Sequence, residues 1–362
     1  MGSTRVRAGQ FIVAEVVLVL VFLAFTGPTW LFIGVAAAGA AVLLATFGRV
    51  DGRWYYEAAL GYERFRRRRA RVAGELVAAT IDAVDPGLAW LRTIAPDLRI
   101  HPVSTRNSGP VGVGTDEHGW FGAVATDGVL VESTLVALLT DAAATVSVAQ
   151  GVIRPDGRLG FVALRLSTPD AVELERAHGL PALGTAIGDA VTRLVRLLRE
   201  RGLSARVLDP DGLLAALVEA SGLDGPPQEH WGTWAAGARA HTFYLVRSGD
   251  WPASLVGSGG PARAISVAAD GASAMLVRVT APAGASARAN RAFAATAGQA
   301  GLRLRRLDGD HAPNAYACSP SGLSPLGADP AAPGRFPGLF AASLGSTRHG
   351  ARTPDEAEQI ER

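Results

Sequence analysis

The stretch "GLSARVLDPD" at residues 202–211 returns as "GLRLRRLDGD" at residues 301–310, and the two align without a gap with six identities in ten positions. Each copy follows a predicted helix and, before that, a predicted hairpin, at 145–167 and at 262–281. The order hairpin, helix, strand therefore occurs twice. This repeat predicts a mixed α/β domain over 76–323, with a pseudo-duplicated hairpin–helix–strand unit whose helices pack on a largely antiparallel sheet.

Two segments of this part of the chain lack a periodic apolar pattern. Residues 222–232, "GLDGPPQEHWG", are expected to form a linker or a long loop, because Gly and Pro interrupt both helices and strands. Residues 324–362 are rich in Pro, Gly, Ala and Ser, and we expect them to form a mobile tail.

The first 48 residues have a different character, because two apolar segments follow each other closely. They lie at about 8–26 and 30–47, and the second contains no charged residue. A helix needs about 20 mainly apolar residues to cross the ~30 Å hydrocarbon core of a bilayer. Gly27 and Pro28 suit the short connection between two such helices. We therefore predict a two-helix transmembrane hairpin over 1–48, in preference to a cleaved signal peptide.

Arginine is concentrated beside this predicted hairpin. Residues 1–75 hold ten Arg and five acidic residues, whereas the rest of the chain holds 25 Arg and 28 acidic residues. Arginines flank both outer ends of the hairpin and are absent from its turn, which predicts a two-pass cell-membrane protein with both termini and the main domain in the cytoplasm. A basic zone confined to one end argues against nucleic-acid binding, which favours a basic folded domain.

The segment after the hairpin, "GRWYYEAALGYERFRRRRAR" at 52–71, combines aromatic residues with seven arginines, six of them within 61–71. Tyr and Trp favour the headgroup layer of a membrane, and clustered Arg attracts anionic lipid. We predict an Arg-rich juxtamembrane helix over 49–75 that contacts membrane lipids. The predicted contact residues are Trp54, Tyr55, Arg64, Arg66, Arg67, Arg68, Arg69 and Arg71.

Motifs for catalysis are missing from the sequence. It contains no Walker A motif, no G-x-S-x-G and no H-E-x-x-H, and its one cysteine, Cys318, allows no internal disulfide or cysteine-based zinc site. We therefore predict no catalytic residue, no metal ligand and no cofactor. One alternative stays open at "LDGDH": Asp308 and Asp310 could hold a divalent cation against a diphosphate, which would make the protein a membrane-tethered, metal-dependent transferase. The other interpretation of this pair is an Asp-Gly turn.

Three blocks together with the hairpin resemble EccE, a membrane component of the type VII (ESX) secretion systems of actinobacteria. The blocks are "GRWYYEAALGYERFRRRR" (52–69), "HTFYLVRSGDWP" (241–252) and "LRLRRLDGDHAPNAYACSPSG" (302–322). The resemblance implies a non-catalytic structural subunit of a secretion complex that supports protein export across the cell membrane. It also implies that the partners are the channel, ATPase and scaffold subunits of that complex.

Overall fold

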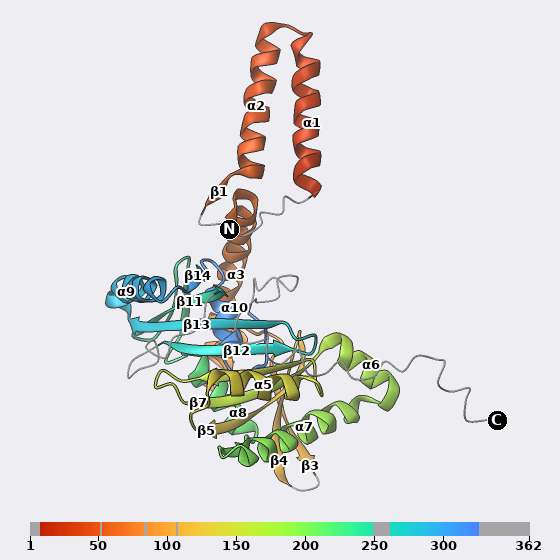
Figure 1. The fold of residues 1–362 in the computed structure, drawn as a ribbon, viewed down its shortest axis with the longest axis vertical. Helices are drawn as coiled ribbons and strands as arrows, with labels where there is room; N and C mark the ends of the chain where they lie inside the picture. The colour runs from red at the N-terminus through yellow and green to blue at the C-terminus, as the bar shows by residue number, and fades with distance from the viewer. Residues whose placement is uncertain (1–7, 51–52, 83–84, 106–107, 249–260, 326–362) are drawn as a thin grey trace, which may run out of the picture. The chain divides into compact units, whose positions relative to one another are not determined.

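The computed structural model describes residues 8–50, 53–82, 85–105, 108–248 and 261–325 (Figure 1). The chain divides into two compact units, Met1–Arg71 and Val72–Arg362, which are described here one at a time. Most of the predicted mobile tail, residues 326–362, lies outside the described residues.

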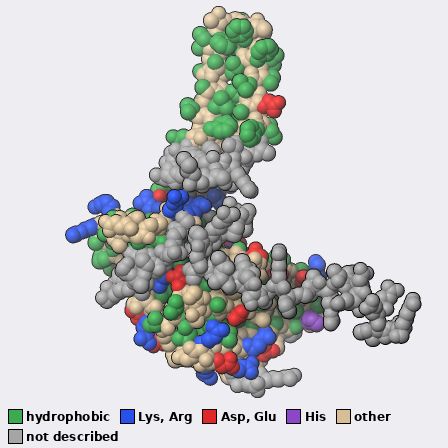
Figure 2. Space-filling view, in the orientation of Figure 1, with side chains coloured by type: hydrophobic (Ala, Val, Ile, Leu, Met, Phe, Trp, Pro, Cys, Tyr) green, Lys and Arg blue, Asp and Glu red, His purple; other side chains and the backbone are tan. Residues whose placement is uncertain are grey.

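Two apolar helices begin the first unit. They are α1 (Ala8–Phe25) and α2 (Thr29–Phe47), and they lie side by side (Figure 1). Most of the side chains on their outer surface are hydrophobic (Figure 2). Gln10 Nε2 donates to the carbonyl of Thr46 at 2.9 Å. Gly39 allows the close approach of the helices, because a Cβ atom there would lie 2.8 Å from Val17 Cγ1. By length and composition α2 can cross a membrane, whereas the apolar part of α1, Gln10–Phe25, is shorter.

The arginine-rich segment is helical. A two-residue ladder pairs β1 (Arg49–Val50) with β2 (Arg53–Trp54), and α3 then runs over Tyr55–Asp82. The helix therefore begins six residues later than the predicted start at 49 and continues past 75. Trp54 ends β2 instead of lying in the helix.

A large antiparallel sheet forms the body of the second unit, which confirms the predicted mixture of helices and sheet. Its strand order is β3-β4-β5-β7-β6-β12-β13-β11-β10-β9, with β8 added beside β5 and β14 beside β11. The strands of the first half are β3 (Arg99–Thr105), β4 (Ser108–Asp116), β5 (Gly119–Asp127), β6 (Val148–Ile153), β7 (Leu159–Ser167) and β8 (Ser204–Val207). Those of the second half are β9 (Pro227–His230), β10 (Thr233–Ala236), β11 (Arg239–Ser248), β12 (Ala262–Ala268), β13 (Ser273–Pro282) and β14 (Arg303–Arg306).

The same pairing pattern occurs in both halves of the sheet. In the first half β5 has β7 on one side and both β4 and β8 on the other; in the second half β11 has β13 on one side and both β10 and β14 on the other. The halves meet where β6 pairs with β12, and Val152 lies opposite Ala264 in this central pair.

Helices cover both faces of this sheet (Figure 1). Side chains of α5, α7 and α9 belong to one buried cluster, and side chains of α4, α8 and α10 belong to a second. The helices are α4 (Pro86–Arg92), α5 (Glu132–Ala143), α6 (Thr168–His178), α7 (Leu180–Glu200), α8 (Pro210–Ser221), α9 (Ser286–Gln299) and α10 (His311–Ala317), with a 3-10 turn, η2, at Ala283–Ala285.

One expectation for this unit is wrong. Residues 222–232 were expected to form a linker or long loop, but Pro227–His230 forms β9, an edge strand that pairs with β10. An edge strand needs hydrogen bonds on one side only, so it tolerates Pro227 and the polar residues that follow.

Candidate functional site

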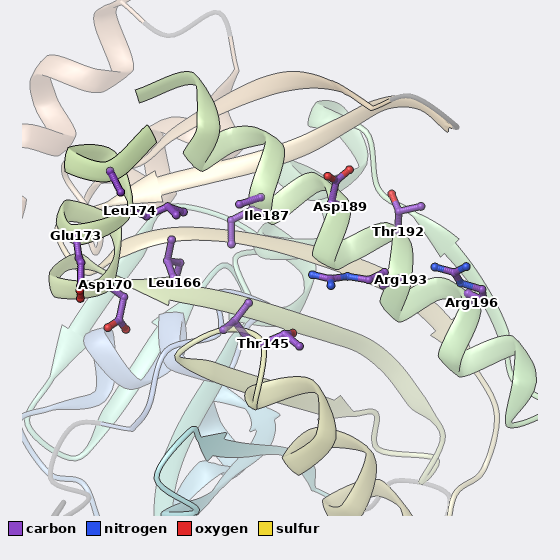
Figure 3. Close-up of a pocket in the computed structure, with 13 residues that line it drawn as sticks. Thr145, Leu166, Asp170, Glu173, Leu174, Ile187, Asp189, Thr192, Arg193 and Arg196 are labelled. Carbon is purple, nitrogen blue, oxygen red and sulfur yellow. The ribbon is translucent and has the colours of Figure 1, made fainter. Parts of the chain in front are cut away.

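A groove of about 700 Å³ opens beside α6 and α7, at the end of β7 (Figure 3). The amphipathic pattern of α7 creates one wall, because its apolar residues, such as Ile187, turn inward to the sheet, while Thr192, Arg193 and Arg196 face the groove. Leu166 of β7 and Leu174 of α6 supply apolar surface. The groove therefore combines an apolar floor with a charged rim.

The charged groups of the groove are separated along its length. Asp170 and Glu173 lie on α6, and Arg193 and Arg196 lie farther along α7, whereas the carboxylate of Asp189 points away from Leu166 and Thr145 (Figure 3). Within the described part of the chain, neither guanidinium group forms an ion pair with these carboxylates. The groove thus presents an acidic end and a basic end to solvent.

Two serines fasten the acidic end to the sheet. Ser167 is the residue before α6, and its Oγ donates to Asp170 Oδ2 at 2.5 Å. Ser147, which precedes β6, also donates to Asp170 Oδ2, and its Oγ accepts from the Ser167 N–H at 2.6 Å. The hydrogen bonds from Ser147 and Ser167 hold the pKa of Asp170 below its usual value. The carboxylate therefore stays charged in the first turn of α6, where the helix dipole favours it.

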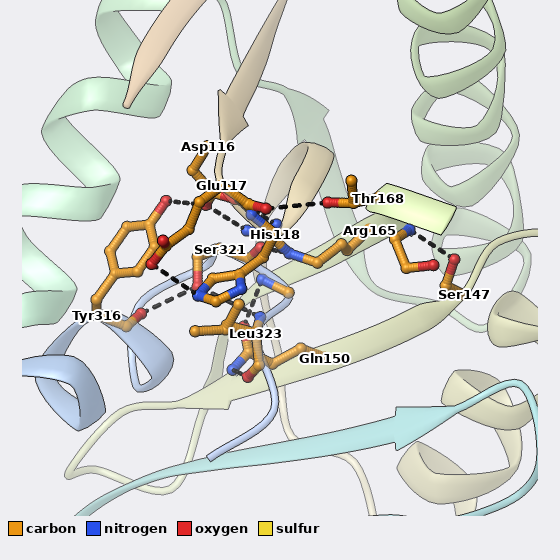
Figure 4. A network of polar contacts seen from close by, with 12 residues as sticks. Asp116, Glu117, His118, Ser147, Gln150, Arg165, Thr168, Tyr316, Ser321 and Leu323 are labelled. Atoms are coloured by element: carbon orange, nitrogen blue, oxygen red, sulfur yellow. Dashed lines mark hydrogen bonds and ion pairs between the residues drawn. The ribbon is translucent and has the colours of Figure 1, made fainter. Parts of the chain in front are cut away.

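A cluster of buried polar side chains lies on the face of β7 opposite the groove (Figure 4). It includes Arg165, the neighbour of Leu166 in the strand. Arg165 Nη1 and Nη2 each donate to a different oxygen of Asp116 at 2.7 Å, and the two side chains are 3% and 2% exposed. Tyr316 Oη donates to Asp116 Oδ2 at 2.7 Å, and Arg165 Nε donates to the carbonyl of Ser321 at 2.9 Å. Burial works to raise the pKa of Asp116, but Arg165, Tyr316 and the N–H of His118 hold it below its usual value.

This cluster connects parts of the chain that are distant in sequence. Gln150 of β6 extends it, since its Nε2 donates to the carbonyl of Ala317 at 2.6 Å and its Oε1 accepts from the N–H of Gly322 at 2.9 Å. Burial raises the pKa of the Tyr316 hydroxyl well above its usual value, and the charge of Asp116 adds to this effect, so Tyr316 stays a neutral donor. The cluster has the completed hydrogen bonding of a structural element and holds residues 316–323 against the first half of the sheet.

The Asp308–Asp310 pair adopts the geometry of a turn. Gly309 has φ +75°, a left-handed conformation, and the Arg306 Nε lies 2.7 Å from Asp308 Oδ1, which is 3.7 Å from His311 Nε2. Burial works to raise the pKa of Asp308, but His311 and Arg306 hold it below its usual value. No group of three or more His, Cys, Asp or Glu side chains able to hold a metal occurs among the residues that the structure describes.

The predicted lipid-contact residues lie on β2 and α3. Tyr55, Arg64, Arg66, Arg67 and Arg69 are exposed, and Arg68 is half-buried. Arg66 and Arg67 both pair with Glu63, at 3.3 Å and 2.8 Å. The side chains of Trp54 and Arg71 lie outside what the structure describes.

Sequence reasoning missed the groove and the buried cluster. Asp116 and Tyr316 are separated by 200 residues, so no local pattern links them. The sequence predicted a helix before residues 202–211, which is α7, but it did not predict the position of α6 beside that helix.

Comparison with known proteins matches part of the chain to a protein family. None of the curated proteins matches the chain. The family model described as "Putative type VII ESX secretion system translocon, EccE" matches residues 155–246. That segment runs from the turn before β7 to β11 and contains α6, α7 and all the groove-lining residues except Thr145 and Val146. The predicted resemblance to EccE is therefore confirmed, and it rests on residues 155–246.

Proposed function

We propose that the protein is a non-catalytic structural subunit of a type VII secretion membrane complex and supports protein export across the cell membrane. The observation that carries this proposal is the EccE match over residues 155–246, which implies a component of that secretion system. The completed hydrogen bonding of the buried Asp116–Arg165 cluster supports it, because a catalytic site needs polar groups open to a substrate.

The membrane attachment in this proposal is a two-pass hairpin made of α1 and α2. The bond from Gln10 to the carbonyl of Thr46 supports it, because a polar side chain near a membrane needs a partner on a neighbouring helix. Arginines at both outer ends of the pair and none in its turn favour cytoplasmic termini and a cytoplasmic main domain.

The lipid contacts in this proposal come from the segment after the hairpin. The contact residues are Trp54, Tyr55, Arg64, Arg66, Arg67, Arg68, Arg69 and Arg71. The exposed positions of Tyr55, Arg64 and Arg69 support this role, since a lipid-contact side chain must be accessible.

The protein partners are the other membrane subunits of the system, including its channel, ATPase and scaffold components. The second unit suits a contact domain, because its surface carries a groove with charged groups at its rim. Within the described residues no group of three or more His, Cys, Asp or Glu side chains could hold a metal.

An export assay separates this function from the metal-dependent transferase alternative. In cells that lack the native protein, the wild-type chain should restore export, and the Asp308→Asn/Asp310→Asn variant should restore it to within about two-fold, because Asp308 pairs with Arg306 at a turn. Loss of export by this variant in a normally assembled complex would contradict the structural role. Metal-dependent binding of a nucleotide sugar by the wild type, absent in the variant, would support the transferase.

A further inference from the structure

The groove is built from parts of the first copy of the internal repeat that have no counterpart in the second copy. The helix α7 ends at Glu200, and α9 ends at Gln299. The offset between these two positions equals the offset between the aligned segments 202–211 and 301–310. Between β13 and α9 only η2 occurs, so α6 has no counterpart there. When α7 and α9 are aligned at their ends, Ala292 and Ala295 stand where α7 has Arg193 and Arg196. The charged groove is therefore an addition to the repeated fold.

The order of chemical groups in the groove restricts what it can bind. Apolar surface from Leu166 and Leu174 lies beside the carboxylates of Asp170 and Glu173, and the guanidinium groups lie at the other end. A peptide that complements this order carries apolar side chains at one end, then cationic side chains opposite the carboxylates, and then anionic side chains opposite the guanidinium groups.

The chain itself carries such a segment after Pro325. Its apolar residues are Phe336, Leu339, Phe340 and Leu344, its next charged residues are Arg348 and Arg352, and the acidic residues Asp355, Glu356 and Glu358 follow. We propose that the groove is the docking site for this C-terminal segment, residues 336–358. In this arrangement Arg348 and Arg352 face Asp170 and Glu173, and the three acidic residues face Arg193 and Arg196. The proposal goes beyond the secretion assignment and does not depend on it.

The end of the described chain lies within reach of the groove. The carbonyl of Leu323 accepts from Gln150 Nε2 at 3.4 Å and from Ser266 Oγ at 3.3 Å. Gln150 holds Leu323 on the sheet face away from the groove, and the tail reaches the groove around the start of β6. Gln150 is three residues, about 10 Å, from Ser147 at that end of the strand, and Ser147 contacts Asp170 of the groove. The ten residues 326–335 span up to about 33 Å when extended, which exceeds this distance.

The buried cluster strengthens the proposed contact. Tyr316, Ser321 and Gln150 fix residues 316–323, so the tail departs from a constant point near the groove. A tethered segment has a high effective concentration at a nearby site, so a contact made of individually weak apolar and ionic interactions is populated.

Photo-cross-linking in the full-length chain tests the proposal. A photoreactive residue replaces Thr192 in the groove, and Thr296 on the outer side of α9 is the matched control. Both hydroxyls donate to the carbonyl four residues earlier, at 2.9 Å and 3.0 Å. We expect cross-links from position 192 to peptides within 336–358 of the same molecule, and none from position 296.

Charge reversal supplies the second arm of the test. Arg193→Glu/Arg196→Glu should lower the cross-link yield at least about five-fold, and adding Asp355→Arg/Glu356→Arg/Glu358→Arg should restore at least about half of it. The control Arg288→Glu/Arg291→Glu has the same spacing on exposed positions of α9 and should leave the yield unchanged. The proposal is overturned if no tail peptide is captured, if the yield is insensitive to the groove charges, or if the product has twice the mass of the chain, which would assign the groove to a second copy.

Discussion

Arg165 on β7 and Asp116 at the end of β4 form a bidentate ion pair. Its two hydrogen bonds both have nitrogen–oxygen distances of 2.7 Å, and both side chains are almost wholly buried. The pair joins the first hairpin of the sheet to the strand that also borders the groove. Through Tyr316 and Ser321 it also holds the last described residues of the chain.

Breaking this ion pair should destabilise the second unit strongly. Arg165→Leu leaves the Asp116 carboxylate buried without its cation, which typically costs about 3–5 kcal/mol of unfolding free energy. Tyr316→Phe removes one hydrogen bond to the same carboxylate and should cost about 1–3 kcal/mol. Denaturant unfolding of the full-length variants in detergent measures both. An Arg165→Leu variant as stable as Tyr316→Phe would show that the pair is not an important fastening.

His241 should make the second unit less stable at acidic pH. Its ring is buried, its Nδ1 lies 2.9 Å from Thr280 Oγ1, and burial, with the charge of Arg278, lowers its pKa from 6.5 to about 3. Below pH 6.5 the unfolded chain therefore binds a proton that the folded chain does not. Stability should fall by up to about 1.4 kcal/mol per pH unit as the pH drops from 6.5 towards 3.

The control for this pH dependence is His241→Gln, which has no titrating ring. Unfolding free energies of both proteins are compared between pH 7 and pH 4.5. We expect a steeper decline for the wild type over this range, and parallel curves would show that His241 is protonated in the folded state.

Gly309 should resist substitution more than Gly301. Both have a left-handed backbone, with φ +75° and φ +76°, so alanine costs about 1–2 kcal/mol at either position. A Cβ atom at Gly309 would also lie 2.3 Å from Trp231 Cζ3, whereas nothing lies within 4 Å at Gly301. In thermal unfolding, the melting temperature of Gly309→Ala should therefore be well below that of Gly301→Ala. Equal decreases in melting temperature would mean that the turn is not packed against Trp231.

The proposed topology predicts where a reporter will be found. A cytoplasm-specific reporter fused after Arg71 should be active, because arginines flank both ends of the α1–α2 pair and avoid its turn. A fusion within the turn, after Gly27, is the control and should be inactive. The opposite pattern would reverse the orientation and place the main domain outside the cell.

Local patterns were enough to predict part of this fold. The aligned segments 202–211 and 301–310 contain the corresponding strands β8 and β14. After β8, Asp209 caps the start of α8, whereas after β14 a turn at Asp308–Gly309 precedes α10. The hairpins at 145–167 and 262–281 are β6–β7 and β12–β13. These elements have strong signals because their hydrogen bonds join residues close in sequence.

Other features could not be predicted because distant packing decides them. The pairing of β6 with β12 joins residues more than 100 positions apart, and the Arg165–Asp116 pair depends on that sheet being assembled. The edge strand β9 was mistaken for a loop because an edge position tolerates Pro and polar residues that a central strand would not. The groove has no sequence signature of its own, since it results from the placement of α6 beside α7.

Purification of the tagged full-length chain from native membranes, followed by native-gel sizing and identification of its partners, tests the central claim most directly. We predict that the chain migrates in one large complex with the type VII channel and ATPase subunits. A chain lacking residues 1–48 should largely leave that complex, because two attachments on one chain reinforce each other and one has been removed. A full-length chain that migrates alone, with no type VII subunit bound, would contradict the account.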